Sequence, residues 1–306
     1  MMSFMKWLGK LAPWLVNAYT PEESSVKPTK ISSEEVVLHG VFKFDFDTDN
    51  RTARVRYCAD KTVESVVVPE QVEKTGENAG FYTVTSIGDL AFRGCPDLSS
   101  ISIPDSVTSI GSSAFERCWS LTSIHIPDGV TSIETYTFIE CYALKSVTIP
   151  NSVTRIESSA FISCRGLTDI IIPDSVVIIE FSAFTQCSSL KSIVIPDSVW
   201  FLGGYAFSEC YSLTSVSLPN SIASIEDRTF CGCRVLGGVT IPDSVSSIGE
   251  SAFGNCKYLG NISIPMSVTS IHPHAFAGCD DVSFTVIPGS YAHKYAMEKG
   301  IPVVYK

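Results

Sequence analysis

The sequence predicts a β-rich repeat solenoid with short helical turns, because a 23-residue unit recurs nine times in register. Cysteine, phenylalanine and proline each recur with this period, in one phase and without an insertion. The three columns run from Cys95 to Cys279, from Phe92 to Phe276 and from Pro104 to Pro288. A fixed period of this length indicates an architecture in which each unit packs on its two neighbours.

Within one unit, residues 95–117, the apolar side chains follow the spacing of a short strand. Leu98, Ile101 and Ile103 point inward from it. A turn, a second extended piece and about two helical turns over residues 112–118 complete the coil. Because one unit cannot bury its apolar lining alone, the units must stack, with their strands in a parallel ladder about 4.8 Å apart.

Segments outside the period are expected to cover the core that the first and last coils would expose. Alternating apolar and polar residues flank a turn at 47–50 and predict a β-hairpin. After the last coil, the sequence predicts a short helix ended by Gly300 and a final strand. We therefore expect four parts: a possible signal or docking peptide at 1–30, an N-terminal β cap with one degenerate repeat and an insertion at 31–83, the repeat array at 84–287, and a C-terminal cap at 288–306.

The repeat resembles the BspA-type leucine-rich repeats, also called the Treponema pallidum class. The run SVTSIGSSAFERCWSLTSIHIPD, residues 106–128, carries the resemblance, and residues 82–92 and 288–306 are similar to the way such arrays begin and finish. The resemblance implies a right-handed leucine-rich-repeat coil and a role in adhesion or protein binding, often at the surface of bacteria or parasitic protists. It implies no catalytic residues.

Composition and motifs narrow the classes of function. The chain has a net charge of −10 and no cluster of lysine and arginine, so nucleic acid and anionic membranes are poor partners and a basic or neutral protein ligand fits better. No apolar run approaches the roughly 18 residues that a transmembrane helix needs. The sequence has no phosphate loop, nucleophile elbow, zinc-protease motif or dinucleotide fingerprint, so we expect a protein that is not an enzyme and uses no cofactor.

The first 20 residues leave the localisation open. Lys10 and Pro13 interrupt their apolar stretch, so a cleaved secretory signal and a retained docking segment are both open. Trp7 and Trp14 fit an amphipathic segment that docks on a partner. We therefore carry two hypotheses: a binding module at a cell surface or secreted, and an intracellular scaffold or assembly subunit docked through this segment.

The cysteine column invites a metal or redox interpretation, because stacked coils place successive thiols within the range that disulfides allow. One thiol per coil gives no paired metal ligands, however, and we expect buried thiols that pack as small apolar residues. Only Cys58 and Cys231 lie off the column, and Cys231 is the better candidate for a reactive thiol. His272 and His274 have no third ligand near in sequence, so no metal site is predicted.

Two adjacent central coils break the polar outside of the repeat. Most coils place small polar residues at the outward strand positions, such as Ser100 and Ser102. In these two coils seven apolar residues stand there or close by: Ile171, Val177, Ile178, Phe181, Val194, Trp200 and Phe201. Exposed apolar clusters mark interaction sites and tryptophan is a frequent hot-spot residue, so these seven predict a partner-binding patch. The alternatives are coverage by the N-terminal 30 residues, contact with a second copy in a homo-oligomer, and unselected drift of the repeat.

A further set of aromatic residues follows the cysteines, on the opposite side of the coil: Trp119, Tyr142 and Tyr211. Aromatic rings can stack on sugars or on proteins, and they can equally pack between neighbouring turns. Together with Trp7 and Trp14, these residues form a secondary set of candidates for partner binding.

Overall fold

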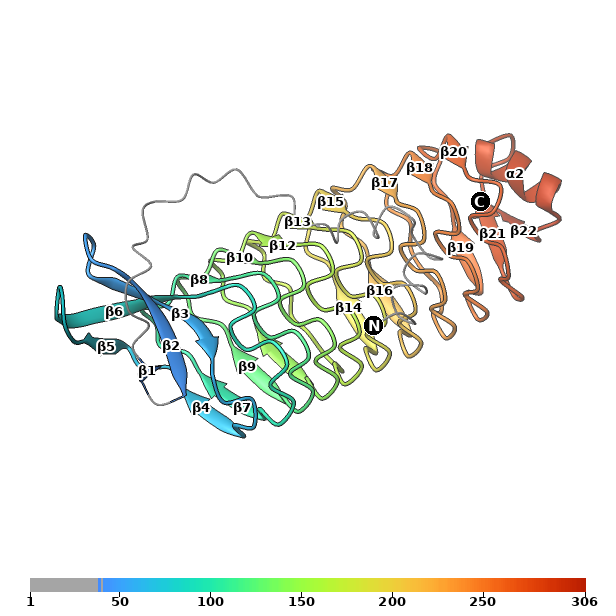
Figure 1. Ribbon diagram of the computed structural model, residues 1–306. Helices are drawn as coiled ribbons and strands as arrows, with labels where there is room; N and C mark the ends of the chain where they lie inside the picture. The colour runs from blue at the N-terminus through green and yellow to red at the C-terminus, as the bar shows by residue number, and fades with distance from the viewer. Residues whose placement is uncertain (1–37, 40) are drawn as a thin grey trace. The chain divides into compact units, whose positions relative to one another are not determined.

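The computed structural model describes residues 38–39 and 41–306. The chain divides into two units, Met1–Ser32 and Ser33–Lys306, and all described residues belong to the second unit. The segment expected at residues 1–30, with Trp7 and Trp14, lies outside the described residues. In the second unit the chain winds as a β-solenoid of stacked coils, which confirms the predicted fold class (Figure 1).

Successive coils contribute strands to two ladders along the array (Figure 1). The first ladder comprises β4 (Ser65–Val67), β7 (Ser100–Ser102), β9 (Ser123–His125), β11 (Ser146–Thr148), β14 (Ser192–Val194), β16 (Ser215–Ser217), β19 (Asn261–Ser263) and β21 (Ser283–Val286). The second ladder comprises β6 (Gly80–Ile87), β8 (Ser109–Ile110), β10 (Ser132–Ile133), β12 (Arg155–Ile156), β13 (Ile178–Ile179), β15 (Phe201–Leu202), β17 (Ser224–Ile225), β18 (Ser247–Ile248) and β20 (Ser270–Ile271). Where neighbouring strands pair within the array they run parallel, one period apart, as Ser123 pairs with Ser146 and Ser132 with Arg155.

Two changes of register mark the ends of the array. Ser65 of β4 pairs with Ser100 of β7, a separation of 35 residues, because the insertion after β4 forms β5 (Gln71–Lys74) and pairs antiparallel with β6. At the other end Asn261 pairs with Ser283, a separation of 22 residues. Both ends therefore depart from the repeat where the caps begin.

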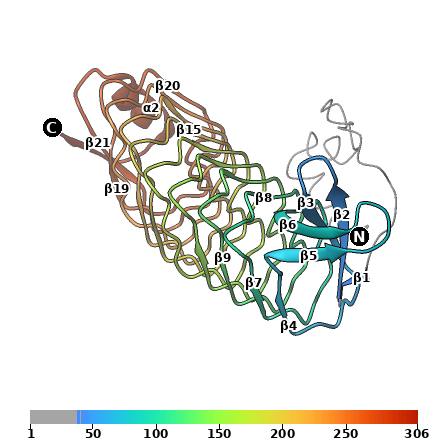
Figure 2. The same ribbon diagram turned by 90° about the vertical axis from the view of Figure 1, so that its left-hand side faces the viewer.

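The N-terminal cap is a hairpin joined to the second ladder (Figure 2). Its strands are β1 (Leu38–His39), β2 (Phe42–Asp47) and β3 (Thr52–Cys58), and β3 runs parallel to β6. The hairpin expected around residues 47–50 is the β2–β3 turn, in which the Asp47 carboxylate accepts hydrogen bonds from the backbone of Asp49 and Asn50. The Phe46 ring meets the edge of the Tyr82 ring at 5.0 Å, so the hairpin covers the end of the core.

The C-terminal cap is α2 (Tyr291–Lys299) followed by β22 (Val303–Tyr305), which pairs with β21. The helix begins after Ser290, whose hydroxyl accepts a hydrogen bond from the backbone of His293. It ends at Gly300, whose φ of 69° is left-handed and therefore suits glycine. This is the helix and strand that the sequence predicts.

The phenylalanine column forms the centre of the core. The rings stack face to face from Phe92 to Phe276, with centroids 5.1–5.8 Å apart and ring planes within 15° of each other. All rings of this column are fully buried except Phe276, the last one, which keeps a small exposed fraction and packs on Phe284 of β21. Each coil thus packs its largest apolar side chain directly on the same side chain of the next coil.

The segment expected as helical turns, residues 112–118, is a series of tight turns and not a helix. Ser113 and Arg117 have φ values of 54° and 61°, and such left-handed residues interrupt a helix. Alternate backbone amides turn away to the next coil, as Phe115 donates to Thr137 at 2.9 Å. The turns therefore add a third ladder of hydrogen bonds between coils, and we call this side of the coil the turn face.

The cysteine column is buried from Cys95 to Cys256, as expected, with Cys279 at its end half-buried, but its thiols also make hydrogen bonds. Each thiol from Cys118 to Cys279 lies 3.0–3.3 Å from the carbonyl oxygen of a phenylalanine one coil earlier, to which it donates. Cys164 donates in this way to Phe138. The Phe138 carbonyl also accepts from the backbone amide of Cys141, so the thiol is a second donor to it, which the methyl group of alanine cannot be. All eleven cysteines are unpaired.

Burial raises the pKa of every one of these eight column thiols above the ordinary value of 9.0. In the unfolded chain the same thiols lose their protons near pH 9, so the folded state binds more protons above that pH. Their contribution to stability is full below pH 9 and falls as the pH rises, by about a factor of ten in the unfolding constant per pH unit and per thiol.

We expect the urea midpoint to drop steeply between pH 9 and 10.5. The double variant Cys164→Ala/Cys187→Ala should show a shallower drop, and identical pH profiles would contradict this account.

Phe184 is fully buried between the rings of Phe161 and Phe207, at 5.1 and 5.3 Å. Replacing Phe184 with alanine should lower the free energy of unfolding by about 3–5 kcal/mol, because a cavity opens in the stack. Phe181→Ala, on the outer side of the same coil, is the matched control and should cost clearly less. Urea titration of both variants measures the difference, and equal losses would count against the stack as the main core contact.

Candidate functional site

The seven apolar residues of the predicted patch lie on two different ladders. Val194 is the outward last residue of β14 and pairs with Ser217, and Ile171 holds the same position one coil earlier. Their side chains are 68% and 83% exposed. Val177, Ile178, Trp200 and Phe201 belong instead to the second ladder, beyond the turn that follows each first strand. The single patch expected from the sequence is therefore two separate surfaces.

Ile178 does not belong to either exposed surface. It pairs with Arg155 on one side and with Phe201 on the other, and only 9% of its surface is exposed. Its two neighbours in the second ladder cover it, which the sequence position alone does not reveal. Its prediction as a contact residue is corrected on this ground.

The remaining residues on the second ladder include three rings in contact, Phe181, Trp200 and Phe201, which we call the aromatic cluster. The Phe201 ring meets Phe181 at 5.8 Å in an edge arrangement, and Trp200 lies 6.1 Å from Phe201. Trp200 is 57% exposed, whereas Phe181 and Phe201 are half-buried. Val177 is half-buried one coil before Trp200, whose backbone amide donates to the Val177 carbonyl.

Two glycines shape the backbone beside this cluster. A Cβ atom at Gly203 would lie 2.6 Å from the backbone nitrogen of Phe181, and one at Gly204 would touch the Phe181 ring at 3.4 Å. The position of Gly203 holds glutamate in the three preceding coils, Glu134, Glu157 and Glu180. Glycine also holds this position in coils without such rings, as at Gly111 and Gly249, so it is not by itself a signal for the aromatic cluster.

Charged side chains border the aromatic cluster on the side of the earlier coils. Arg155 contacts Glu157 at 2.7 Å and Glu180 at 3.3 Å. The hydrogen bond to Glu157 raises the pKa of the Arg155 guanidinium, which keeps the guanidinium charged. An apolar centre with a charged border is the composition of a protein interface.

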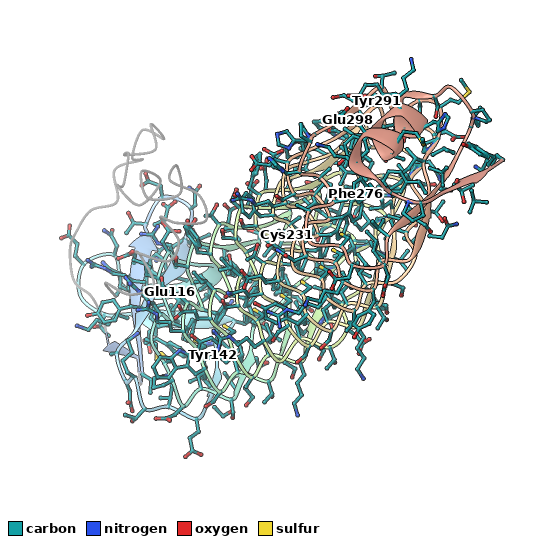
Figure 3. The ribbon with its side chains drawn as sticks, turned by 90° about the vertical axis from the view of Figure 1, so that its right-hand side faces the viewer. Glu116, Tyr142, Cys231, Phe276, Tyr291 and Glu298 are labelled. Carbon is teal, nitrogen blue, oxygen red and sulfur yellow. The ribbon has the colours of Figure 1, made fainter. Side chains whose placement is uncertain are left out.

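The secondary aromatic residues lie on the turn face, where Figure 3 labels Tyr142 together with Glu116 and Cys231. Trp119 stacks on Tyr142 at 6.4 Å, and the Arg165 guanidinium covers the Tyr142 ring at 5.0 Å. Trp119 is 48% exposed, so it keeps the most surface for a partner.

Tyr211, farther along the turn face, makes a hydrogen bond and a cation–π contact with nearby side chains. Its hydroxyl donates to Glu209 at 2.7 Å, and Arg234 lies over its ring at 4.7 Å. Burial and this hydrogen bond raise the pKa of Tyr211 to about 12. Tyr142 and Tyr211 thus pack against arginine side chains of the next coil, and their part in partner binding stays a prediction.

Cys231 is half-buried on the turn face, and burial raises the pKa of its thiol. A raised pKa lowers the reactive thiolate fraction, so the structure does not support Cys231 as a reactive thiol. Among the residues that the structure describes, no three His, Cys, Asp or Glu side chains lie close enough to hold a metal ion. The His272 and His274 rings lie with their centroids 5.7 Å apart, and they belong to no such group of three.

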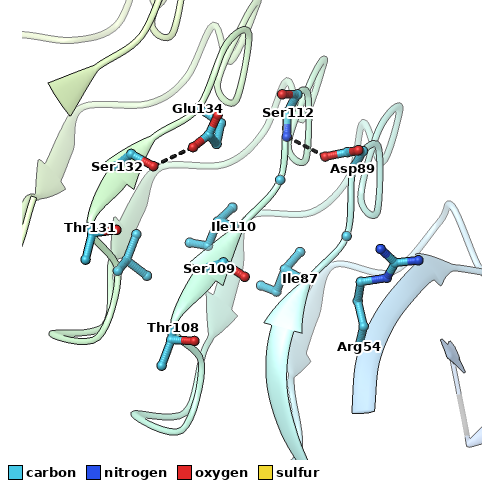
Figure 4. A pocket seen from close by; sticks show the side chains of 13 residues that line it. Arg54, Ile87, Asp89, Thr108, Ser109, Ile110, Ser112, Thr131, Ser132 and Glu134 are labelled. Atoms are coloured by element: carbon cyan, nitrogen blue, oxygen red, sulfur yellow. Dashed lines mark hydrogen bonds between the residues drawn. The ribbon is translucent and has the colours of Figure 1, made fainter. Parts of the chain in front are cut away.

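A hollow of about 250 Å³ lies on the second ladder near the N-terminal cap (Figure 4). Its wall includes Asp89, which accepts a hydrogen bond from the backbone of Ser112 at 2.8 Å, and Glu134, which accepts one from the Ser132 hydroxyl. Arg54 reaches its edge but forms an ion pair with Asp45 at 2.6 Å. Asp89 and Glu134 are thus bound to other residues of the wall and Arg54 to Asp45 outside it, and these groups form no set of nucleophile, base and oxyanion donors.

The described part of the chain contains no helix with the length and apolar character to cross a bilayer. A comparison with curated protein sequences gave no match. Among solved structures, the chain is similar to a leucine-rich repeat protein of Bacteroides ovatus, with 26% identity and a TM-score of 0.61 over 89% of this chain and 67% of that one. It also resembles the T. pallidum leucine-rich repeat protein (27% identity, TM-score 0.49, 74% and 91% covered) and a leucine-rich cell surface protein of Faecalibacterium prausnitzii (26% identity, TM-score 0.41, 89% and 98% covered).

The repeats also match a known family, described as the BspA type leucine-rich repeat region, in six copies over residues 59–191 and 177–296. These ranges cover most of the chain and include both ladders, the phenylalanine stack and the aromatic cluster. The expected resemblance is therefore confirmed, and the chain belongs to the family of BspA-type leucine-rich-repeat proteins.

Proposed function

We propose that the chain is a non-catalytic binding module whose central coils hold a protein ligand through the aromatic cluster. One observation carries this proposal: the exposed Trp200 and its neighbour Phe201 stand where most other coils present serine or threonine, and Phe181 packs on Phe201. Burying such rings releases apolar surface from water, and tryptophan is among the residues that dominate binding energy. The Arg155 ion pairs beside the rings supply the polar rim.

Adhesion or recognition of a partner at a cell surface is the setting that we propose for this binding. Membership of the BspA-type family and the absence of a catalytic constellation among the described residues support it. A net charge of −10 favours a ligand with a neutral or basic contact surface. The exposed pair Ile171 and Val194 offers a smaller apolar contact on the first ladder.

An intracellular scaffold docked through residues 1–30 is the second candidate. The eleven unpaired cysteines favour it, because thiols persist in reducing compartments. Comparing the full chain with a variant that lacks residues 1–30 separates the two candidates. Retained binding supports the central coils as the site, and lost binding supports the segment.

The double variant Trp200→Ser/Phe201→Ser tests the aromatic cluster. We expect it to weaken ligand binding at least about 30-fold, the effect of losing about 2 kcal/mol at a hot spot. Ligands would first be captured on the immobilised full chain and identified by mass spectrometry, and their affinities then measured by biolayer interferometry.

Tyr258→Ser is the matched control, because Tyr258 is an aromatic residue, 65% exposed, that belongs to neither set of binding candidates. It should leave the affinity unchanged, and both variants should keep the urea midpoint of the unmodified chain within a small margin. If the double variant binds as tightly as the control, the aromatic cluster is not the binding surface.

A further inference from the structure

Aromatic rings on the turn face are covered by arginine side chains of the neighbouring coil. Three tyrosines there carry the guanidinium of the arginine that stands one period later in the chain: Tyr142 with Arg165, Tyr205 with Arg228, and Tyr211 with Arg234. Each guanidinium carbon lies 4.7–5.3 Å from the centroid of its ring, within the range of a cation–π interaction. The array thus uses arginine from the next coil to cover these rings.

The aromatic cluster has no such cation from its neighbouring coils. Ala223 and Ser224 stand one period after Trp200 and Phe201, where the turn face would supply an arginine. Among the described residues, no lysine or arginine lies over the ring of Trp200 or Phe201. Arg155, two coils before Phe201 in the same ladder, is bound to two glutamates. Within the described coils, the place of a cation on these two rings is therefore left to a partner.

Carboxylates follow the same side of the second ladder. Two residues after the outward strand position, several coils have a glutamate that accepts a hydrogen bond from that position: from Ser132 to Glu134, from Arg155 to Glu157, and from Ser224 to Glu226. In the coil of Phe201 this position is Gly203, which has no carboxylate. The rings of this coil therefore lie between the glutamates of the preceding and the following coil, Glu180 and Glu226.

Glu226 is the carboxylate of this column that can meet a cation from outside. Glu180 shares Arg155 with another glutamate, whereas in the described part of the chain no lysine or arginine forms an ion pair with Glu226. The Glu226 carboxylate accepts a hydrogen bond from Ser224, which holds the position of Phe201 one coil later. Neighbouring coils are about 4.8 Å apart, so this carboxylate lies beside the aromatic cluster.

We propose that the aromatic cluster binds an arginine side chain of the protein ligand, with its guanidinium stacked on Trp200 and Phe201 and facing the Glu226 carboxylate. This inference rests on the proposed binding function and adds the chemistry that the ligand must present. A guanidinium suits the site better than an ammonium group, because it is planar and weakly hydrated. It can stack on a ring while its N–H groups donate to a carboxylate.

The test follows Trp200 directly in the full chain. Fluorotryptophan labelling gives a fluorine NMR resonance for each of the four tryptophans, and Trp200→Phe assigns the resonance of the cluster. The probes are a peptide of alternating glycine and arginine and the same peptide with citrulline, which has the shape of arginine but no charge. We expect the arginine peptide to shift the Trp200 resonance in a saturable way, and the citrulline peptide to bind at least about fivefold more weakly.

Glu226→Gln should weaken the binding of the arginine peptide about threefold and leave that of the citrulline peptide unchanged. Glu298→Gln is the matched control, because it removes the same charge from α2, where the Glu298 side chain is 76% exposed. The control should leave both dissociation constants unchanged. Equal weakening by the two variants would trace the effect to net charge and overturn the role of Glu226.

The unmodified chain decides the arginine assignment even if a variant fails to fold. Equal binding of the two peptides, a shift confined to the other tryptophans, or no shift with either peptide would overturn it. These outcomes leave the proposed function to its own test: loss of the captured ligand in Trp200→Ser/Phe201→Ser would still support the aromatic cluster as a binding surface. Retained binding of that ligand would overturn the proposed function separately.

Discussion

The stacking of identical side chains one period apart is the constraint on which the rest of this structure depends. Each phenylalanine ring packs on the ring of the next coil at 5.1–5.8 Å, close to the spacing of neighbouring strands. An insertion inside a coil would shift the ring out of the stack and break the hydrogen bonds of both ladders and the turn face together. This explains why extra residues occur at the junction with the N-terminal cap and not within the array.

The cysteines belong to the same constraint. Their thiols donate to the phenylalanine carbonyls of the preceding coil, so the column that looks like a redox or metal motif in the sequence is a further set of contacts between coils. The pattern also explains the exception. Where the array meets the N-terminal cap, the Cys95 Sγ lies 3.7 Å from the Lys61 Nζ instead.

Much of the fold follows from the sequence because it is periodic. The strand pairing, the phenylalanine core, the hairpin at residues 47–50 and the stop at Gly300 each rest on a local pattern with one physical meaning. The turns at 112–118 do not, because non-glycine residues such as Ser113 and Arg117 take left-handed conformations there and hydrogen bonds to the next coil stabilise them. The division of the apolar patch and the burial of Ile178 escape prediction for a similar reason: both depend on which strands lie side by side.

The proposed binding surface lies on central coils whose outward positions are apolar, although their buried core is the same as in the other coils. Photo-crosslinking from two equivalent positions tests this most directly: Val177 beside the aromatic cluster, and Thr269, which holds the same outward position four coils later. With benzoylphenylalanine at either position and the captured ligand present, the account predicts a covalent adduct from position 177 and none from 269. Equal adducts from both positions, or an adduct from 269 alone, would contradict it.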